Sequence, residues 1–138
     1  MKKKNKKVKR LPFKETSHLI VKEEPDYDSL TPIFSFRHMK YGSDNCLSQC
    51  TQDSKSSIVS ILLKLSQFTW NQLASKRKES LGFEGIPCDQ FTVPLPPFVT
   101  PDVKKIMVFR YSGAGRIAGI RIHDIYHILI VGANLYPH

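Results

Sequence analysis

Three apolar runs near the C-terminus restrict most strongly what this chain can fold into. They cover about residues 105–111, 115–122 and 125–131; the turn Ser112-Gly113-Ala114-Gly115 joins the first two runs, and His123-Asp124 joins the last two. Runs of β-branched and aromatic residues of this length are typical of strands, and such short connections join antiparallel neighbours. The sequence therefore predicts an antiparallel meander at this end of the chain.

The segment before the meander predicts two helices. Aliphatic residues recur at helical spacing over 53–66. A second helix is expected to begin at Thr69, because Thr69 and Gln72 have the spacing of a capping box, and Gly82 is the expected stop. Alternating aromatic residues predict one more strand at about 33–39. The expected fold class is α+β, a small antiparallel sheet in the order β-α-α-β-β-β with two helices packed on one face.

Proline and charge divide the rest of the chain. Five prolines within Phe83–Pro101 exclude a regular helix and predict an extended connector that packs on the domain through its apolar residues. The net charge is +9, and the first ten residues hold seven basic side chains. We interpret residues 1–30 as a disordered tail and 31–138 as a single domain. The tail is either a solvated segment or a nonspecific phosphate-binding arm.

Strand register assigns side chains to the two faces of the predicted meander. The assumed register places Ile122 opposite Ile125 and Tyr111 opposite Arg116. The face expected to pack against the helices then carries Met107, Phe109, Ala118, Ile120, Ile122, Ile125, His127, Leu129 and Val131. The opposite face would display Arg110, Arg121 and Tyr126.

The arginines of these strands are the expected RNA-binding residues. A guanidinium on an open sheet face is a fork-shaped receptor for phosphate or carboxylate, so we expect Arg110, Arg116 and Arg121 to bind RNA, with Tyr126 beside them. The alternative is that one or two of them pair with Asp124 or with helix carboxylates.

His127, Tyr136 and His138 are the expected catalytic residues. Histidine titrates near neutral pH, and a neighbouring arginine would lower its pKa and favour a general base. The alternative for His127 is a satisfied histidine in the core, and the alternative for Tyr136 and His138 is a frayed chain end.

Cysteine and hydropathy patterns bear on the cellular compartment, on membrane insertion and on metal binding. Three cysteines, without a recognisable secretion signal, favour a reducing cytoplasm, and no apolar run is long enough to predict a membrane span. Cys46, Cys50, Cys88 and His38 match a zinc site only loosely. We expect ordinary thiols, with no metal and no small-molecule cofactor.

The element order in a small basic protein resembles the RelE/ParE superfamily of bacterial toxins. The resemblance rests on Arg110, Gly115-Arg116-Ile117, Arg121 and Tyr136. It implies two helices on one side of an antiparallel sheet, with a messenger RNA gripped on the other side and cleaved through its 2′-hydroxyl. It also implies the ribosome and an antitoxin protein as partners.

The C-terminal pattern also resembles a group of small bacterial proteins without an assigned function. Their pattern is F-R, G-R-I-x-G-x-R, H-x-L and L-Y-x-H, present here in Phe109-Arg110, Gly115–Arg121, His127–Leu129 and Leu135–His138. Two functions therefore stay open. The first is a RelE-like mRNA endoribonuclease toxin, and the second is a noncatalytic nucleic-acid- or protein-binding module, including a gyrase-inhibiting toxin or a mobile-element accessory protein.

Overall fold

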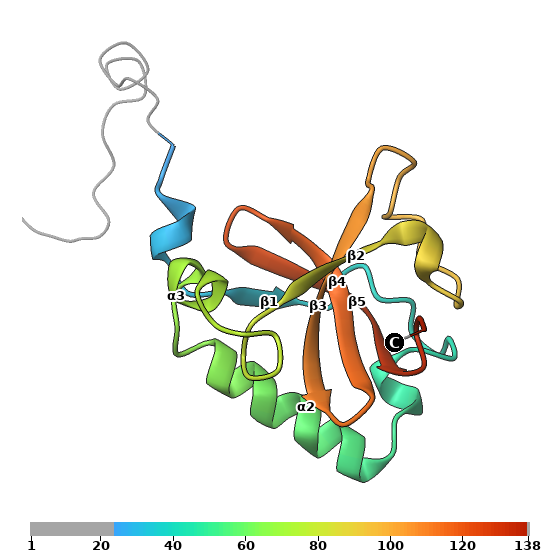
Figure 1. Cartoon of the computed structure of the whole chain (residues 1–138). Coiled ribbons are helices and arrows are strands. Elements are labelled where there is room, and N and C mark those ends of the chain that lie inside the picture. The colour runs from blue at the N-terminus through green and yellow to red at the C-terminus, as the bar shows by residue number, and fades with distance from the viewer. Residues whose placement is uncertain (1–23, 138) are drawn as a thin grey trace, which may run out of the picture.

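The predicted meander forms the centre of the sheet. β3 (Lys105–Ser112), β4 (Gly115–Ile122) and β5 (Ile125–Ala133) are antiparallel neighbours, as the short turns require. The computed structural model describes residues 24–137, and within them the strand order is β1-β5-β4-β3-β2 (Figure 1). The expected α+β class is confirmed.

The two edge strands differ from the expectation. β1 (Ile33–Ser35) is shorter than predicted and pairs parallel to β5, so the sheet is mixed rather than wholly antiparallel. β2 (Glu84–Pro87) pairs antiparallel to β3 inside the segment expected to be only a connector. A proline cannot donate to a strand ladder, but at the end of an edge strand no partner needs its nitrogen. Pro87 therefore ends β2 without preventing it.

The helices begin where the local sequence caps them. α2 (Gln52–Leu65) is capped by Thr51, whose side chain accepts from the Ser54 amide. α3 (Trp70–Ala74) has the predicted capping box, in which Thr69 and Gln72 satisfy each other's backbone amides. α3 ends well before the predicted stop at Gly82.

Gly82 has a different role from the predicted helix stop. Its amide donates to the Arg77 carbonyl at 2.8 Å, and a Cβ at this position would lie 2.3 Å from the Lys76 carbonyl oxygen. Only glycine permits this close approach of two backbone segments.

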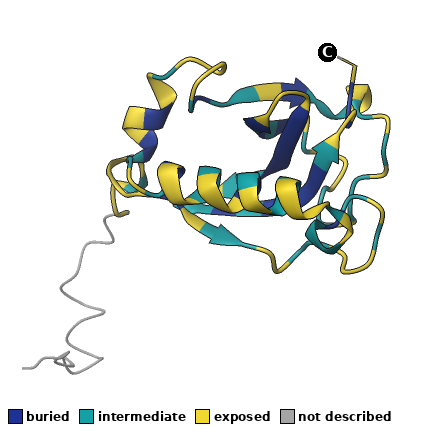
Figure 2. Cartoon of the chain, turned by 90° about the horizontal axis from the view of Figure 1, so that it is seen from below, coloured by how far each residue is buried: buried dark blue, intermediate teal, exposed yellow. Residues whose placement is uncertain are grey.

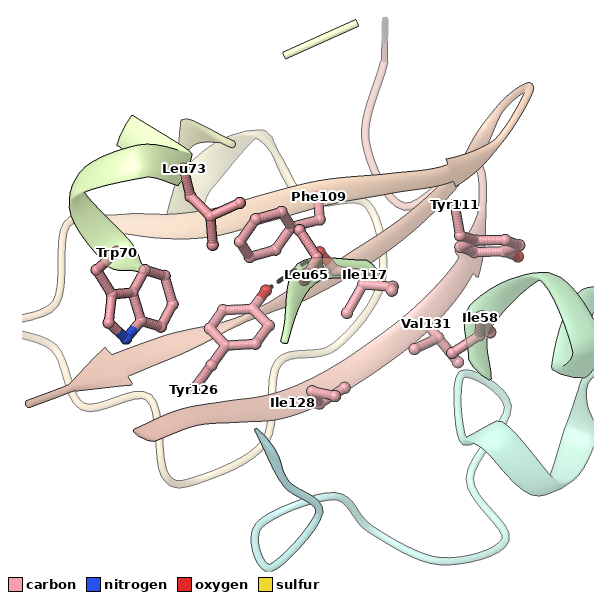
Figure 3. Close-up of a cluster of buried hydrophobic side chains, with 10 residues drawn as sticks. All are labelled: Ile58, Leu65, Trp70, Leu73, Phe109, Tyr111, Ile117, Tyr126, Ile128 and Val131. Atoms are coloured by element: carbon pink, nitrogen blue, oxygen red, sulfur yellow. Dashed lines mark hydrogen bonds between the residues drawn. The ribbon is translucent and has the colours of Figure 1, made fainter. Parts of the chain in front are cut away.

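One face of the sheet packs against both helices. Trp70 of α3 meets Phe109 and Tyr126 of the sheet at ring-centroid distances of 6.5 and 6.4 Å, and all three are almost fully buried (Figure 3). Around them lie further buried residues of the helices and strands, namely Ile58, Leu65, Leu73, Tyr111, Ile117, Ile128 and Val131. Figure 2 shows the outer side of α2 exposed and the strands behind it buried.

The opposite face is covered by the proline-rich segment, residues 88–103, which we call the strap. Phe91, Val93, Leu95, Val99 and Val103 of the strap pack on the sheet. The buried partners on this side are Ile86, Ile106, Val108, Ala118, Ile130, Leu135 and Tyr136. The sheet therefore has no open face in the described part of the chain, and the expected packing of the connector on the domain is correct.

Two irregularities in strand pairing overturn much of the predicted face assignment. Ile122 lies opposite Ile125, as assumed, but Arg116 pairs with Arg110 rather than with Tyr111. A second shift makes Leu129 an extra residue between two consecutive pairs of β4 and β5. Met107, Phe109 and Val131 face the helices as predicted, whereas Ala118 and Ile120 face the strap.

Tyr126 is the main correction, because it lies inside the helix-side core and not on a surface for RNA. Its hydroxyl donates to the carbonyl oxygens of Met107 at 2.7 Å and Ile117 at 3.2 Å, and burial raises its pKa well above the ordinary value. Gly119 makes room for this arrangement, since a Cβ there would lie 2.1 Å from the His127 carbonyl oxygen and 3.0 Å from Tyr126 Cζ.

Residues 24–30, which the sequence placed in the tail, lie against the domain. They contain a single 3-10 turn, Tyr27–Ser29. The Leu30 carbonyl accepts from the Trp70 amide at 3.0 Å, and the Ile33 amide donates to Asp124 at 3.0 Å. The rest of the predicted tail, residues 1–23, lies outside the described residues. Within 24–137, no helix combines the length and apolarity that crossing a bilayer requires.

We predict that Tyr126→Phe lowers the free energy of unfolding by about 1–2 kcal/mol, because two buried carbonyls lose their shared donor. Urea denaturation measures this change. Tyr41→Phe is the matched control, since Tyr41 is 87% exposed and its replacement should leave stability unchanged. Equal stability of both variants would contradict a structural role for the Tyr126 hydroxyl.

Candidate functional site

Arg116 and Tyr136 come together, but inside the protein. Each side chain is 4% exposed, and Arg116 Nε donates to the Tyr136 hydroxyl at 3.2 Å. Arg116 Nη1 also donates to the carbonyls of Gly113 and Gly115. Arg116 thus ties the β3–β4 turn to the C-terminal segment. Neither the predicted RNA contact of Arg116 nor the predicted catalytic role of Tyr136 fits this burial.

The other two arginines lie in separate surroundings. Arg121 Nη2 is 2.6 Å from Asp28 Oδ1, at the end of the sheet nearest α3. Arg110 Nη2 is 3.9 Å from Glu84 Oε2, and Lys78 Nζ is 3.1 Å from the same carboxylate. The three arginines therefore do not form one receptor. Two of them pair with carboxylates, as the alternative expected, but with Asp28 and Glu84 rather than with Asp124 or a carboxylate of α2 or α3.

Among the described residues, His127 is the predicted catalytic residue that lies beside other ionisable side chains. Its ring centroid is 5.1 Å from that of His38, which follows β1, and 5.3 Å from that of Phe98 in the strap. His38 stacks on Phe98 at 3.7 Å with an interplanar angle of 8°. Both histidines are half-buried. We call His38, His127 and the neighbouring Arg37 the histidine cluster.

The environment of His127 favours its neutral form. Desolvation by burial lowers the pKa of His127 below its ordinary value, and positive charge at His38 and Arg37 lowers it further. His127 Nδ1 is buried and has no hydrogen-bond partner, which makes a doubly protonated ring costly. An imidazole kept neutral beside a second imidazole has the composition of a general acid–base pair.

Parallel pairing of β1 with β5 creates the cluster. Ser35 lies opposite His127 in this pairing, so the chain places His38 beside His127 only three residues beyond the strand. Arg37 stays exposed, and its amide donates to the Ser35 hydroxyl at 3.1 Å. Sequence reasoning found His127 but missed Arg37 and His38 as its neighbours. The sequence feature that could have indicated these neighbours is the Phe-Arg-His run at the end of the predicted first strand.

The remaining candidates do not join this cluster. His138 lies outside the described residues. Among the described residues, no three histidine, cysteine or carboxylate side chains are grouped so that they could hold a metal ion. Cys46 lies instead in an apolar groove with Phe36, Met39, Tyr41 and Leu47.

No protein-family model, curated protein or solved structure matches this chain.

The depressed pKa of His127 predicts a pH dependence of stability. Above the ordinary imidazole pKa of 6.5 the ring is neutral in both states, so its contribution to stability is fully present. As the pH falls below 6.5, the unfolded chain takes up the proton first and the folded state loses stability. The loss continues until the lower folded-state pKa is passed.

Urea unfolding at several pH values between 7.5 and 5.5 tests this prediction. We expect the free energy of unfolding of the wild type to fall more steeply with decreasing pH than that of His127→Gln, which lacks the titrating ring. Parallel pH profiles of the two proteins would refute the depressed pKa.

Proposed function

We propose that this protein is an RNA-cleaving toxin whose acid–base pair is His38 and His127. The observation that carries this proposal is the 5.1 Å separation of the two imidazole rings beside the positive charge of Arg37. Cleavage of RNA through its own 2′-hydroxyl needs one group to accept a proton, one to donate a proton and a cation near the phosphate. The histidine cluster contains all three.

The lowered pKa of His127 assigns the two roles. Neutral His127 accepts the proton of the 2′-hydroxyl while the 2′-oxygen attacks phosphorus. Protonated His38 donates its proton to the departing 5′-oxygen as the P–O5′ bond breaks. The products are a 2′,3′-cyclic phosphate and a 5′-hydroxyl end, and no metal or other co-reactant is needed for this balance.

Arg37 and Phe98 supply the contacts that the chemistry requires besides proton transfer. Arg37 is exposed next to the imidazoles, where its guanidinium can hold the scissile phosphate and stabilise its developing charge. Phe98 stacks on His38 and so fixes the orientation of that ring. This proposal keeps the expected reaction but moves it from an arginine-rich sheet face to the histidine cluster.

The basic character of the chain supports RNA as the substrate. A net charge of +9 favours association with a polyanion through counterion release, independently of sequence. In this proposal the ribosome supplies the messenger RNA and a second protein, the antitoxin, restrains the activity.

We predict that His38→Gln and His127→Gln each lower RNA cleavage about 100-fold or more, the range of general acid–base catalysis. The protein would be expressed in a bacterial host from a tightly controlled promoter. Growth of the culture would be recorded, and the 5′ ends of its messenger RNAs would be mapped by primer extension. Growth arrest with new 5′-hydroxyl ends is expected for the wild type and not for either of these two variants. For the purified protein with ribosomes, the cleavage rate should be bell-shaped in pH.

His123→Asn is the matched control. His123 has a φ of 60°, a backbone conformation that asparagine also adopts, and its ring lies in the β4–β5 turn against Tyr27. It should retain full cleavage. Intact messages in the presence of the wild-type protein would eliminate the nuclease proposal.

A noncatalytic binding module is the second candidate, favoured by the apolar groove at the start of α2. Tyr41 is 87% exposed and Phe36 is 43% exposed at this groove, an unusual position for two large rings. The same growth experiment separates the candidates. Arrest that survives both histidine substitutions but is lost in Tyr41→Ala would assign the toxicity to binding of a protein target.

A further inference from the structure

The end of β4 nearest α3 holds a second cationic feature, and a segment of the chain itself covers it. A surface pocket there is lined by Pro25, Asp26, Tyr27, Asp28, Arg121 and His123. We propose that Arg121 is a phosphate-binding residue and that residues 24–30 form a lid, in which the Asp28 carboxylate occupies the position of a phosphate oxygen. We call this pocket the Arg121 site.

Arg121 is held in place without help from Asp28. Its guanidinium carbon lies 4.3 Å from the centroid of the Trp70 ring, and its Nε donates to the His123 carbonyl at 2.5 Å. These two contacts fix the plane and direction of the guanidinium and leave Nη2 for an anion. The receptor therefore stays formed when the carboxylate leaves.

The lid is attached weakly at its centre. No residue of the Tyr27–Ser29 turn is buried, and the Asp28 side chain is 57% exposed. An ion pair at the surface contributes little to stability, so an anion can exchange with it. Tyr27 packs on the His123 ring at 4.3 Å, and the Leu30 carbonyl is bonded to Trp70. Opening would thus release Asp28 while Leu30 stays anchored.

Phosphate is the ligand class that fits this exchange. Carboxylate and phosphate oxygens bind a guanidinium in the same geometry, and phosphate brings more charge and more acceptor oxygens. The phosphate can be free in solution or part of a nucleic-acid backbone. The inference goes beyond the proposed function, because Arg121 packs on the helix side of the sheet and His127 on the strap side.

Trp70 is the only tryptophan of the chain, so its fluorescence reports directly on the cation stacked over it. Inorganic phosphate would be titrated into the wild type and into Asp28→Asn. We expect the apparent Kd to fall about tenfold in Asp28→Asn, because a competing charge in contact with the guanidinium has been removed.

Two further variants make the titration specific. Asp89→Asn removes the same charge from an exposed residue of the strap, on the face of the sheet opposite Arg121, so its Kd should equal that of the wild type. Asp28→Asn combined with Arg121→Gln should show no saturable response. Thermal melting of each variant confirms that it is folded.

A ten-nucleotide 2′-O-methyl RNA distinguishes the two sources of phosphate. This RNA cannot be cleaved by 2′-hydroxyl attack, so the result does not depend on the nuclease proposal. A tenfold gain for both ligands identifies a nucleic-acid contact, and a gain for inorganic phosphate alone identifies a site for the free anion. The proposal is overturned by an unchanged Kd in Asp28→Asn, by an equal gain in Asp89→Asn, or by binding that survives the loss of Arg121.

Discussion

The central constraint on this protein is that its β3–β4–β5 meander must be covered on both faces. On one face Tyr126 lies against Phe109 and Trp70, with its hydroxyl bonded to two strand carbonyls. On the other face the strap packs its apolar side chains over the same strands. Burying an unpaired charge in either layer would be costly, so the charged groups of the strands either find carbonyl partners, as Arg116 does, or lie at the rim. The candidate sites are therefore rim sites, and a flat surface for RNA on the sheet is absent from the described residues.

Much of the architecture follows from local rules. The capping box at Thr69 specifies the start of α3, and the tight turn at His123 specifies the pairing of Ile122 with Ile125. The face assignment failed over β4 and the first part of β5, because alternation alone does not reveal an irregularity in strand pairing. The shift between Arg110 and Ser112 reverses the predicted faces of β4 and of β5 as far as Ile128, so Tyr126 faces the helices against the prediction. The extra residue Leu129 reverses the alternation once more, so Val131 faces the helices as predicted.

In the candidate site, too, the sequence identified the residue with a local pattern and missed the residues that only tertiary structure brings close. His127 was identifiable because a histidine among aliphatic strand residues is conspicuous. His38 and Phe98 were not, because they reach His127 from two segments distant in sequence. Their approach depends on parallel pairing of a three-residue edge strand and on the path of the strap. Neither the direction of this edge strand nor the path of the strap leaves a periodic pattern in the sequence, because both are decided by tertiary packing.

The β4–β5 hairpin is the element that joins the two rim features. Arg121 pairs with Tyr126 across the hairpin, and the preceding Ile120 pairs with His127. Because successive strand residues point to opposite faces, adjacent positions of one hairpin supply a cation to the helix side and an imidazole to the strap side. The two sites differ in what restrains them. His127 is surrounded by neighbouring rings, and burial lowers its pKa, whereas the Arg121 guanidinium forms an ion pair with Asp28 of the lid. Residues 25–28 of the lid lie against Arg121 and His123, whereas Phe98 of the strap lies against His127, so the hairpin carries two features of different chemistry that are covered by different segments of the chain.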